Sequence, residues 1–195
     1  MSRVLVTDAS RGLGHGFARH YLAQGDTILG SCRDSTAPGI NSLRKEFCGR
    51  FIPVEFDVRE AEAANAAAER AAGHVDALDL LINNAGTAPR EPGTGVTDID
   101  EEQVSLAFDV NVLGPARVLK AFYPLLSRGE NPRVVMISST AGSMGLTRGG
   151  RSIPYCVSKA SLTIEDSVRS MTAVIEGLTV NSAPYQDYSG KEIPW

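Results

Sequence analysis

Short apolar runs that alternate with helical segments constrain the fold of this chain more than any other feature. Five such runs predict strands, at residues 3–7, 27–31, 51–58, 78–83 and 133–138. Their side chains are mostly apolar on both faces, which is typical of strands buried in a parallel sheet. Helical patterns lie between and after them, at residues 12–25, 39–48, 60–72, 101–127 and from Ser152 onward. This alternation predicts right-handed crossovers and an α/β fold with a doubly wound parallel sheet of about six strands.

Length and composition indicate one ordinary globular domain. The chain has 195 residues, and we expect a single domain over residues 1–195. Its net charge of -4, without a basic block, argues against nucleic acid and acidic membranes as partners. Cys32, Cys48 and Cys156 lack metal-ligand spacing, which predicts reduced thiols in a cytoplasmic protein and no metal site. The N-terminus enters a strand at once, so we expect no signal peptide, and no apolar run reaches membrane-spanning length.

The stretch VTDASRGLG, residues 6–14, joins the first predicted strand to the first predicted helix. Ligands of open α/β sheets bind beyond the carboxyl ends of the strands. Glycine lets the backbone approach a pyrophosphate, and a helix N-terminus offers unpaired N–H groups. The stretch therefore predicts a nucleotide-phosphate site, with a tight turn that binds nothing as the alternative. We assign to this site Thr7, Asp8, Ser10, Arg11, Gly12, Leu13 and Gly14.

Asp8 stands where such a turn favours its first glycine. Aspartate tolerates left-handed backbone geometry better than most residues, so the turn is expected to form. A carboxylate that faces the phosphates would repel them and weaken binding. A carboxylate that turns away would instead accept local hydrogen bonds, as in an Asx turn. We therefore expect a modified phosphate site.

Four further motifs follow in order: NNAG at residues 83–86, Asn111 within FDVNVLGP, ISST at 137–140 and YCVSK at 155–159. Together with the glycine turn they resemble the short-chain dehydrogenase/reductase family, over residues 1 to about 162. TRGGRSI before the tyrosine and the ending DYSGKEIPW resemble the sniffer-type and C-factor-like branch of that family. The resemblance implies a Rossmann-type fold and nicotinamide chemistry.

The resemblance also implies a catalytic set of Ser139, Tyr155, Lys159 and Asn111. Tyr155 and Lys159 are four residues apart, so they lie on one face of a helix. A neighbouring ammonium favours the phenolate, which would let Tyr155 exchange a proton with a substrate oxygen. Lys159 would also hold the ribose, and Asn111 would hold a water that links Lys159 to solvent. Ser139 would orient the carbonyl, with Ser138 as the alternative.

Charge at the end of the second strand predicts the cofactor. Cys32 occupies the position where NAD-preferring members have an acid, and Arg33 follows it. Arg33 and Arg11 suit a 2′-phosphate, so we expect NADP(H) in preference to NAD(H). The alternative is that Arg33 only pairs with Asp34. By the resemblance Asp57 contacts the adenine amino group. The remaining residues assigned to the cofactor are Val58, Asn83, Ala85, Gly86, Tyr155 and Lys159.

The resemblance is interrupted after residue 162, where the chain is shorter than the family pattern. One helix–strand unit and the substrate loop are expected to be absent. We predict a helix from Ser152 to Glu176 and a tail strand at 183–188 beside strand 133–138. A rival alignment makes TVNSAP, residues 179–184, the sixth strand.

Two functions follow. The first is an NADP(H)-dependent oxidoreductase, a homodimer or homotetramer, that reduces a carbonyl or oxidises an alcohol on a small molecule. The alternative is a catalytically weak or inactive relative that acts as a binding or signalling protein.

Overall fold

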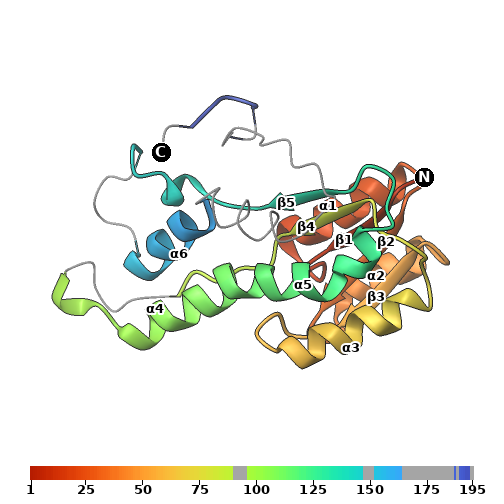
Figure 1. Cartoon of the computed structure of the whole chain (residues 1–195), viewed down its shortest axis with the longest axis horizontal. Helices are drawn as coiled ribbons and strands as arrows, with labels where there is room; N and C mark the ends of the chain where they lie inside the picture. Colours follow the sequence, from red (N-terminus) through yellow and green to blue (C-terminus); the bar gives the residue numbers. More distant parts are fainter. Residues whose placement is uncertain (90–95, 147–151, 164–186, 188, 194–195) are drawn as a thin grey trace. The chain divides into compact units, whose positions relative to one another are not determined.

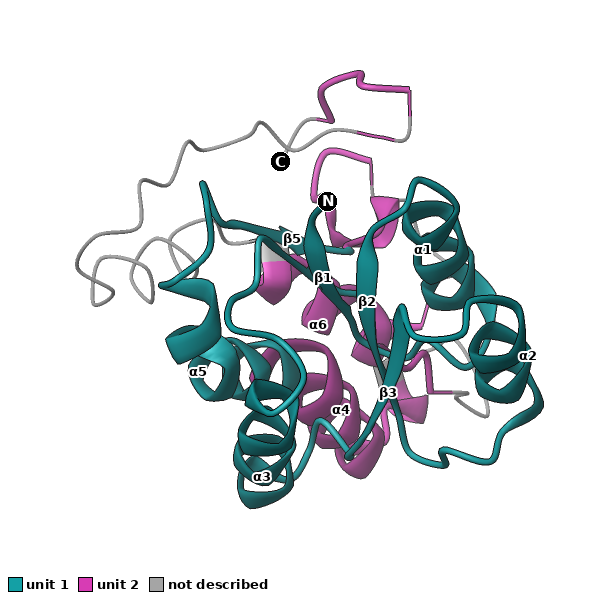
Figure 2. Cartoon of the chain, turned by 90° about the vertical axis from the view of Figure 1, so that its right-hand side faces the viewer, with its two compact units in different colours: residues 1–85, 114–137 teal, residues 86–113, 138–195 magenta. Residues whose placement is uncertain are grey.

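The computed structural model of the chain describes residues 1–89, 96–146, 152–163, 187 and 189–193. The chain divides into two compact units, shown in different colours in Figure 2. The first, here called the sheet unit, comprises Met1–Ala85 and Gly114–Ile137. The second, here called the helical unit, comprises Gly86–Leu113 and Ser138–Trp195.

The sheet unit is built on five parallel strands in the order β3-β2-β1-β4-β5 (Figure 1). These are β1 (Arg3–Val6), β2 (Thr27–Cys32), β3 (Phe51–Glu55), β4 (Leu80–Asn83) and β5 (Arg133–Met136). The central strand β1 pairs Val4 with Ile28 of β2 on one side and with Leu80 of β4 on the other. The predicted doubly wound, Rossmann-type α/β sheet is confirmed. Of the predicted tail strand at 183–188, residues 183–186 and 188 lie outside the described residues.

Four helices cover the sheet, two on each face (Figure 2). One face carries α1 (Gly12–Ala23) and α2 (Pro38–Glu46), and the other carries α3 (Ala61–Ala72) and α5 (Gly114–Leu126). The apolar faces of these helices and the strands form the core, which explains the continuous apolar runs in the sequence. Among its fully buried side chains are Val4, Leu5, Val6, Leu22, Ile28, Leu29, Leu81, Phe122 and Leu126.

A salt bridge fastens the start of the sheet. The carboxylate of Asp79 accepts hydrogen bonds from the Arg3 backbone nitrogen at 2.8 Å and from Arg3 Nε at 2.9 Å. Arg3 Nη2 lies 2.8 Å from Asp79 Oδ1, and the Glu130 backbone N–H also donates to this carboxylate. The hydrogen bonds from Arg3 lower the pKa of Asp79 to about 2. The pair therefore links the beginnings of β1, β4 and β5 at ordinary pH.

The opposite end of the sheet is held by the hydroxyl of Thr7. Thr7 Oγ1 accepts hydrogen bonds from the backbone N–H groups of Asn84 at 2.9 Å and Ala85 at 2.8 Å. The Asn84 side-chain amide donates to the Thr7 carbonyl at 2.9 Å. These bonds join the carboxyl ends of β1 and β4, and so they fix where the glycine turn and the NNAG motif leave the sheet.

In the helical unit, α4 (Glu101–Phe108) packs against α6 (Ile153–Thr163). The predicted helix over 101–127 is confirmed, with one difference: a π-helical turn, η2 (Asp109–Leu113), separates α4 from α5. The helix expected from Ser152 begins at Ile153 and is described as far as Thr163, and its expected continuation to Glu176 lies outside the described residues. The described residues of this unit also form two short 3-10 turns, η1 (Val96–Asp98) and η3 (Thr140–Gly142). None of the helices in the described part of the chain is long and apolar enough to cross a membrane.

Gly14 tests the packing of α1 against the sheet. A Cβ at this position would overlap the Asp8 carbonyl oxygen and the Asn84 side-chain amide, so backbone would have to move. We expect Gly14→Ala to lower the free energy of unfolding by about 2–3 kcal/mol in urea denaturation.

Gly16 provides the matched control, because a Cβ there would meet nothing within 4 Å. Gly16→Ala should raise the stability by about 0.5–1 kcal/mol through helix propensity. Equal effects of the two substitutions would show that α1 does not lie this close to the end of β1.

Candidate active site

The glycine turn carries two residues in the left-handed backbone conformation. Asp8 and Gly12 both have φ of 55°. For an aspartate this conformation costs about 1–2 kcal/mol more than a right-handed one, whereas glycine adopts it freely. The Asp8 carboxylate accepts a hydrogen bond from the Ser10 hydroxyl at 3.2 Å, and the Asp8 N–H donates to Ser31 Oγ at 3.2 Å. The turn therefore forms with aspartate in place of its first glycine, and its carboxylate is held by a neighbour within the turn.

The N-terminus of α1 is exposed and is not capped by any side chain. Gly12 has open space around its missing side chain, and Arg11 and Leu13 beside it are exposed. Gly14 is buried against the turn, as described above. Uncapped N–H groups at a helix N-terminus bind anions, so this turn has the backbone features of a phosphate site.

The end of β2 carries a cation and no acid. Cys32 is buried, and burial raises the pKa of its thiol to about 11, so it remains a neutral thiol at ordinary pH. Arg33 follows it, exposed, and forms no ion pair with any described residue. Asp34, the alternative partner for Arg33, instead accepts hydrogen bonds from the Thr36 backbone at 2.7 Å and the Thr36 hydroxyl at 2.6 Å.

Two further predicted cofactor residues have distinctive surroundings. Asp57, after β3, is bound by Arg59, with Arg59 Nη2 at 2.8 Å from Asp57 Oδ2. Asn83, at the end of β4, is buried and donates its side-chain amide to Met136 Sδ at 3.3 Å. Its Oδ1 atom has no hydrogen-bond partner among the described residues. Val58 is buried, and Ala85 donates to Thr7.

The helical unit contains a buried polar network around Asn111. Asn111 is completely buried in the π-helical turn η2. Its Oδ1 accepts from the Thr87 N–H at 2.7 Å, and its Nδ2 donates to the Thr87 carbonyl at 2.8 Å and to Ser158 Oγ at 2.9 Å. Ser158 donates in turn to the Tyr155 carbonyl at 2.9 Å. The network joins the loop after Gly86, the π-helical turn and the helix that carries Tyr155.

Lys159 and Tyr155 come together on α6, as their spacing predicts. Lys159 is only 4% exposed, and its Nζ lies 5.9 Å from the centre of the Tyr155 ring. Burial lowers the pKa of Lys159 to about 8, because removal from water disfavours the charged ammonium. A lysine with a lowered pKa beside a tyrosine is typical of a proton-transfer site.

The two candidate serines point to different partners. The Ser138 hydroxyl donates to the Lys159 carbonyl at 3.4 Å. Ser139 Oγ accepts from the Ala141 N–H at 3.1 Å and so caps the turn η3. A Cβ on Gly142 would lie 2.6 Å from the Lys159 carbonyl oxygen, so glycine lets this turn pack against α6. Ser138 therefore binds the backbone of α6, whereas Ser139 lies at the start of the turn.

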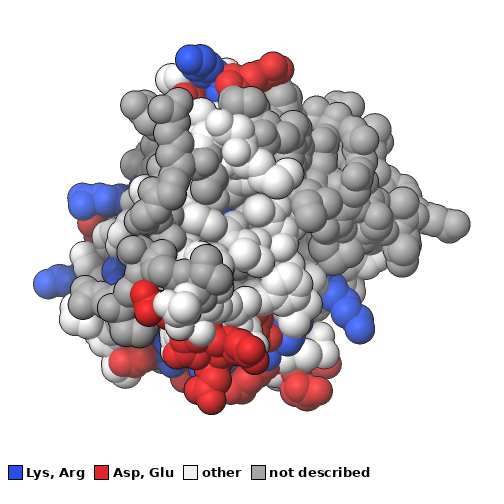
Figure 3. All heavy atoms as spheres, turned by 90° about the vertical axis from the view of Figure 1, so that its left-hand side faces the viewer, with Lys and Arg blue, Asp and Glu red and all other residues white. Residues whose placement is uncertain are grey.

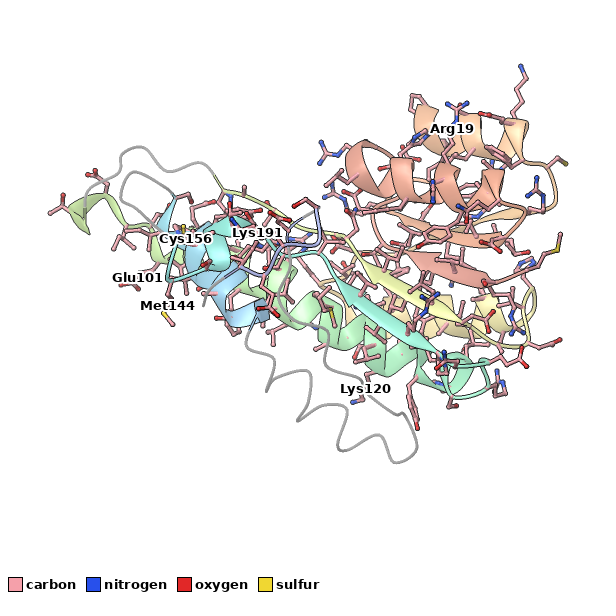
Figure 4. All side chains as sticks on the ribbon, turned by 90° about the horizontal axis from the view of Figure 1, so that it is seen from above. Arg19, Glu101, Lys120, Met144, Cys156 and Lys191 are labelled. Carbon is pink, nitrogen blue, oxygen red and sulfur yellow. The ribbon has the colours of Figure 1, made fainter. Side chains whose placement is uncertain are left out.

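The sequence prediction omitted three residues that bind predicted site residues: Asn84 and Arg59 in the sheet unit, and Ser158 in the helical unit. Each stands next to a predicted residue within NNAG, YCVSK or the stretch after FDV. Among the described residues the structure shows no group of three or more potential metal-ligating side chains. Cys156, which follows Tyr155 and is labelled in Figure 4, forms no disulfide.

A parallel sheet with a glycine turn after β1, and a helix bearing Tyr155 and Lys159, define a nucleotide-dependent oxidoreductase fold. The model of the short chain dehydrogenase family matches residues 2–182, and the chain belongs to this family.

Known relatives support this assignment along most of the chain. The chain is 26% identical to the short-chain dehydrogenase srdF of Neurospora crassa over 249 aligned positions, which cover 98% of this chain and 97% of the relative. Among solved structures, the NADPH-bound carbonyl reductase from chicken fatty liver has a TM-score of 0.79 at 29% identity, covering 91% of this chain and 76% of that one. A carbonyl reductase from Pseudomonas aeruginosa PAO1 has a TM-score of 0.82 at 27% identity, covering 100% of both chains. Several other curated relatives are longer, and this chain spans less than two thirds of their length.

The buried ammonium of Lys159 should reduce stability. Its folded pKa of about 8 lies below the ordinary lysine pKa of 10.5, so between these values the unfolded chain binds more protons. The destabilisation is therefore fully present below pH 8 and disappears as the pH rises through 10.5. We expect Lys159→Met to raise the free energy of unfolding near neutral pH by about 1–3 kcal/mol, and this gain to shrink in alkali.

Lys120, an exposed lysine of α5 labelled in Figure 4, is the control. Lys120→Met should leave the unfolding free energy within about 0.5 kcal/mol of the wild type at every pH. If Lys159→Met instead lowered stability near neutral pH, polar contacts of the ammonium would outweigh its desolvation.

Proposed function

We propose that the chain is an NADP(H)-dependent oxidoreductase that reduces a carbonyl or oxidises an alcohol on a small molecule, with Tyr155 as proton donor and acceptor. The observation that carries this proposal is the buried Lys159 ammonium 5.9 Å from the Tyr155 ring. A positive charge in a dry site favours the phenolate of a neighbouring tyrosine, and so eases the transfer of its proton.

The residues present fit a phosphorylated dinucleotide. The uncapped N-terminus of α1 and the open space at Gly12 suit the pyrophosphate. Arg11 and Arg33 are exposed cations that suit a 2′-phosphate. Cys32 stands at the position where an NAD-binding site has an acid that accepts a hydrogen bond from the ribose 2′-hydroxyl, so that acid is absent here. Asn83 Oδ1 is a buried acceptor without a described partner. The chicken carbonyl reductase, which is similar in fold, is an NADPH-bound structure. These features favour NADP(H) over NAD(H).

The roles of the catalytic residues follow from their chemistry. The nicotinamide supplies or accepts the hydride when it is bound. In the direction of reduction Tyr155 donates its proton to the substrate oxygen, and Lys159 stabilises the phenolate that remains. Ser139 donates a hydrogen bond to the substrate oxygen and orients it, and this role suits Ser139 better than Ser138, whose hydroxyl binds Lys159. Asn111 binds the π-helical turn to Thr87 and Ser158. In the proposed mechanism it also holds a water that links Lys159 to solvent.

A second candidate is a catalytically weak relative that binds a nucleotide as a binding or signalling protein. Two observations favour it. Asp8 places a carboxylate in the phosphate turn. The alignment with the Neurospora relative has 249 positions whereas this chain has 195 residues, so at least 54 positions of the relative have no counterpart here. We propose that the absent positions include the helix–strand unit and the substrate loop expected after residue 162, and that the chain belongs to a sniffer-type or C-factor-like branch of the family.

The proposed setting is a cytoplasmic, single-domain enzyme that forms a homodimer or homotetramer. Its cysteines form no disulfide, which suits a reducing compartment. The packed helices α4 and α6 expose Phe108 and Val157, which are 38% and 45% exposed, and a second subunit would cover them. Acidic side chains gather at the lower edge of the face in Figure 3, and the described basic ones there are scattered. This distribution argues against a nucleic-acid partner for that face.

Loss of the tyrosine hydroxyl tests the proposal. Tyr155→Phe should lower the rate of NADPH-dependent reduction of a panel of aldehydes and ketones by about 100-fold or more, because the proton donor is removed. NADPH affinity, measured by fluorescence titration, should remain within about twofold, since the hydroxyl acts in the transition state.

Tyr123→Phe removes a tyrosine hydroxyl in α5 and should leave the rate unchanged. Retained turnover in Tyr155→Phe would refute the catalytic assignment. A wild-type chain that binds NADPH but turns over no carbonyl in the panel would favour the second candidate.

A further inference from the structure

Asp57 and Arg59 form a close ion pair beyond the end of β3. Arg59 donates to the Asp57 carboxylate from its backbone nitrogen at 2.9 Å, from Nε at 3.1 and 3.2 Å, and from Nη2 at 2.8 Å. Asp57 Oδ1 and Oδ2 each accept two of these contacts. A carboxylate has about four lone-pair sites, so Arg59 occupies most of its acceptor capacity.

The pair is local and partly shielded from water. The Asp57 side chain is 17% exposed and that of Arg59 44%. The two residues are separated by one position, so little chain entropy is lost when they meet. The Arg59 hydrogen bonds lower the pKa of Asp57, burial opposes this effect, and the charge of Arg33 adds to it. Asp57 is therefore ionised and paired.

Arg33 lies at the same edge of the sheet. Cys32 pairs with Glu55 across β2 and β3, and the Phe56 N–H donates to the Cys32 carbonyl at 2.9 Å. Arg33 directly follows β2, and Asp57 lies two residues beyond the end of the neighbouring strand β3. Arg33 is close enough for its charge to act on Asp57.

The other carboxylates at this edge are also engaged. Asp34 accepts from Thr36, and Glu55 accepts from the Ser35 N–H at 2.8 Å. With Asp57 held by Arg59, each of these three acids has a donor other than Arg33. Arg33 forms no ion pair with the described residues, although an acid lies beside it.

We infer that Arg59 is a positioning residue: by occupying the carboxylate of Asp57 it leaves Arg33 available to the 2′-phosphate of NADP(H). Without Arg59, Asp57 binds Arg33, and the phosphate has to compete with a carboxylate for the same guanidinium. The inference rests on the proposed use of NADP(H), and it adds a selectivity determinant outside the glycine turn and the end of β2. It also explains why an acid so close to Arg33 is compatible with binding of a phosphate.

The expected size of the effect follows from competition. If Arg33 is captured by Asp57 about nine-tenths of the time, the apparent affinity for the phosphate falls about tenfold. The probes are adenosine 2′,5′-bisphosphate and 5′-AMP, which differ by the 2′-phosphate, and calorimetry measures their dissociation constants. Arg59→Ala should weaken the bisphosphate about tenfold and 5′-AMP by less than about twofold.

Two double variants separate this role from a direct contact or a change in net charge. In an Arg33→Ala background, Arg59→Ala should have no further effect on bisphosphate binding, because the guanidinium that it protects is gone. In Asp57→Asn with Arg59→Ala, the preference for the bisphosphate over 5′-AMP should return to within about threefold of the wild type, because no carboxylate competes for Arg33, and any loss of an adenine contact by Asp57 affects both probes alike. Arg19→Ala is the control: Arg19, labelled in Figure 4, forms an exposed ion pair with Glu46 on α1 and α2, and its loss should change neither affinity.

The results that overturn the inference differ from those that overturn the proposed function. An Arg59→Ala effect that persists without Arg33, or that the Asp57→Asn change does not reverse, would show that Arg59 contacts the ligand itself. Equal loss for both probes would place Arg59 at the adenosine. If these variants fail to alter binding while the wild type prefers the bisphosphate, only the inference fails. A wild type with no preference for the bisphosphate refutes both.

Discussion

The hydroxyl of Thr7 is the contact on which the rest of the sheet unit depends. It accepts two backbone N–H groups from Asn84 and Ala85, and the Asn84 amide returns a bond to the Thr7 carbonyl. These bonds lie where parallel strands deliver their ligand-binding loops. Because β1 and β4 are joined there, the turn that begins with Asp8 leaves the sheet in one direction, and Gly14 lets α1 pack onto it. The left-handed conformation of Asp8 is maintained within this frame.

In the helical unit, too, buried polar side chains hold separate segments together, but burying them costs folding free energy. A lysine that is 4% exposed is destabilising by itself, and a fully buried asparagine is tolerated only because all its polar atoms are bonded. Thr87 and Ser158 provide those bonds, so the loop, the π-helical turn and α6 hold one another in place. Such an arrangement is expected where chemistry requires a buried charge, and it is difficult to explain as packing alone.

The sequence predicted the sheet because its strands are short, continuous apolar runs, and such runs indicate strands that are buried on both faces. The resemblance to the dehydrogenase family pointed to Tyr155 and Lys159, and their i and i+4 spacing predicted that they lie on one face of a helix. It did not reveal the π-helical turn at Asp109–Leu113, which has no distinctive pattern, nor the bond from Asn111 to Ser158, which joins residues far apart in the chain. The role of Asn84 was missed because its partner is 77 positions away. Arg59 is only two residues from Asp57, yet its pairing depends on the geometry of the loop after β3.

The central claim is that the turn with Asp8 remains the phosphate site of an NADP(H)-binding protein. Fluorescence titration of the wild type and of Asp8→Gly with NADPH and NADH tests it most directly. The account predicts that the wild type binds NADPH at least about tenfold more tightly than NADH, because the proposal assigns Arg33 and Arg11 to the 2′-phosphate, which NADH lacks. Asp8→Gly should tighten both cofactors by a similar factor, up to about tenfold, because it removes a carboxylate, held here by Ser10, from the turn proposed to bind the pyrophosphate that they share. Equal affinities for the two cofactors in the wild type, or no binding by either protein, would contradict it.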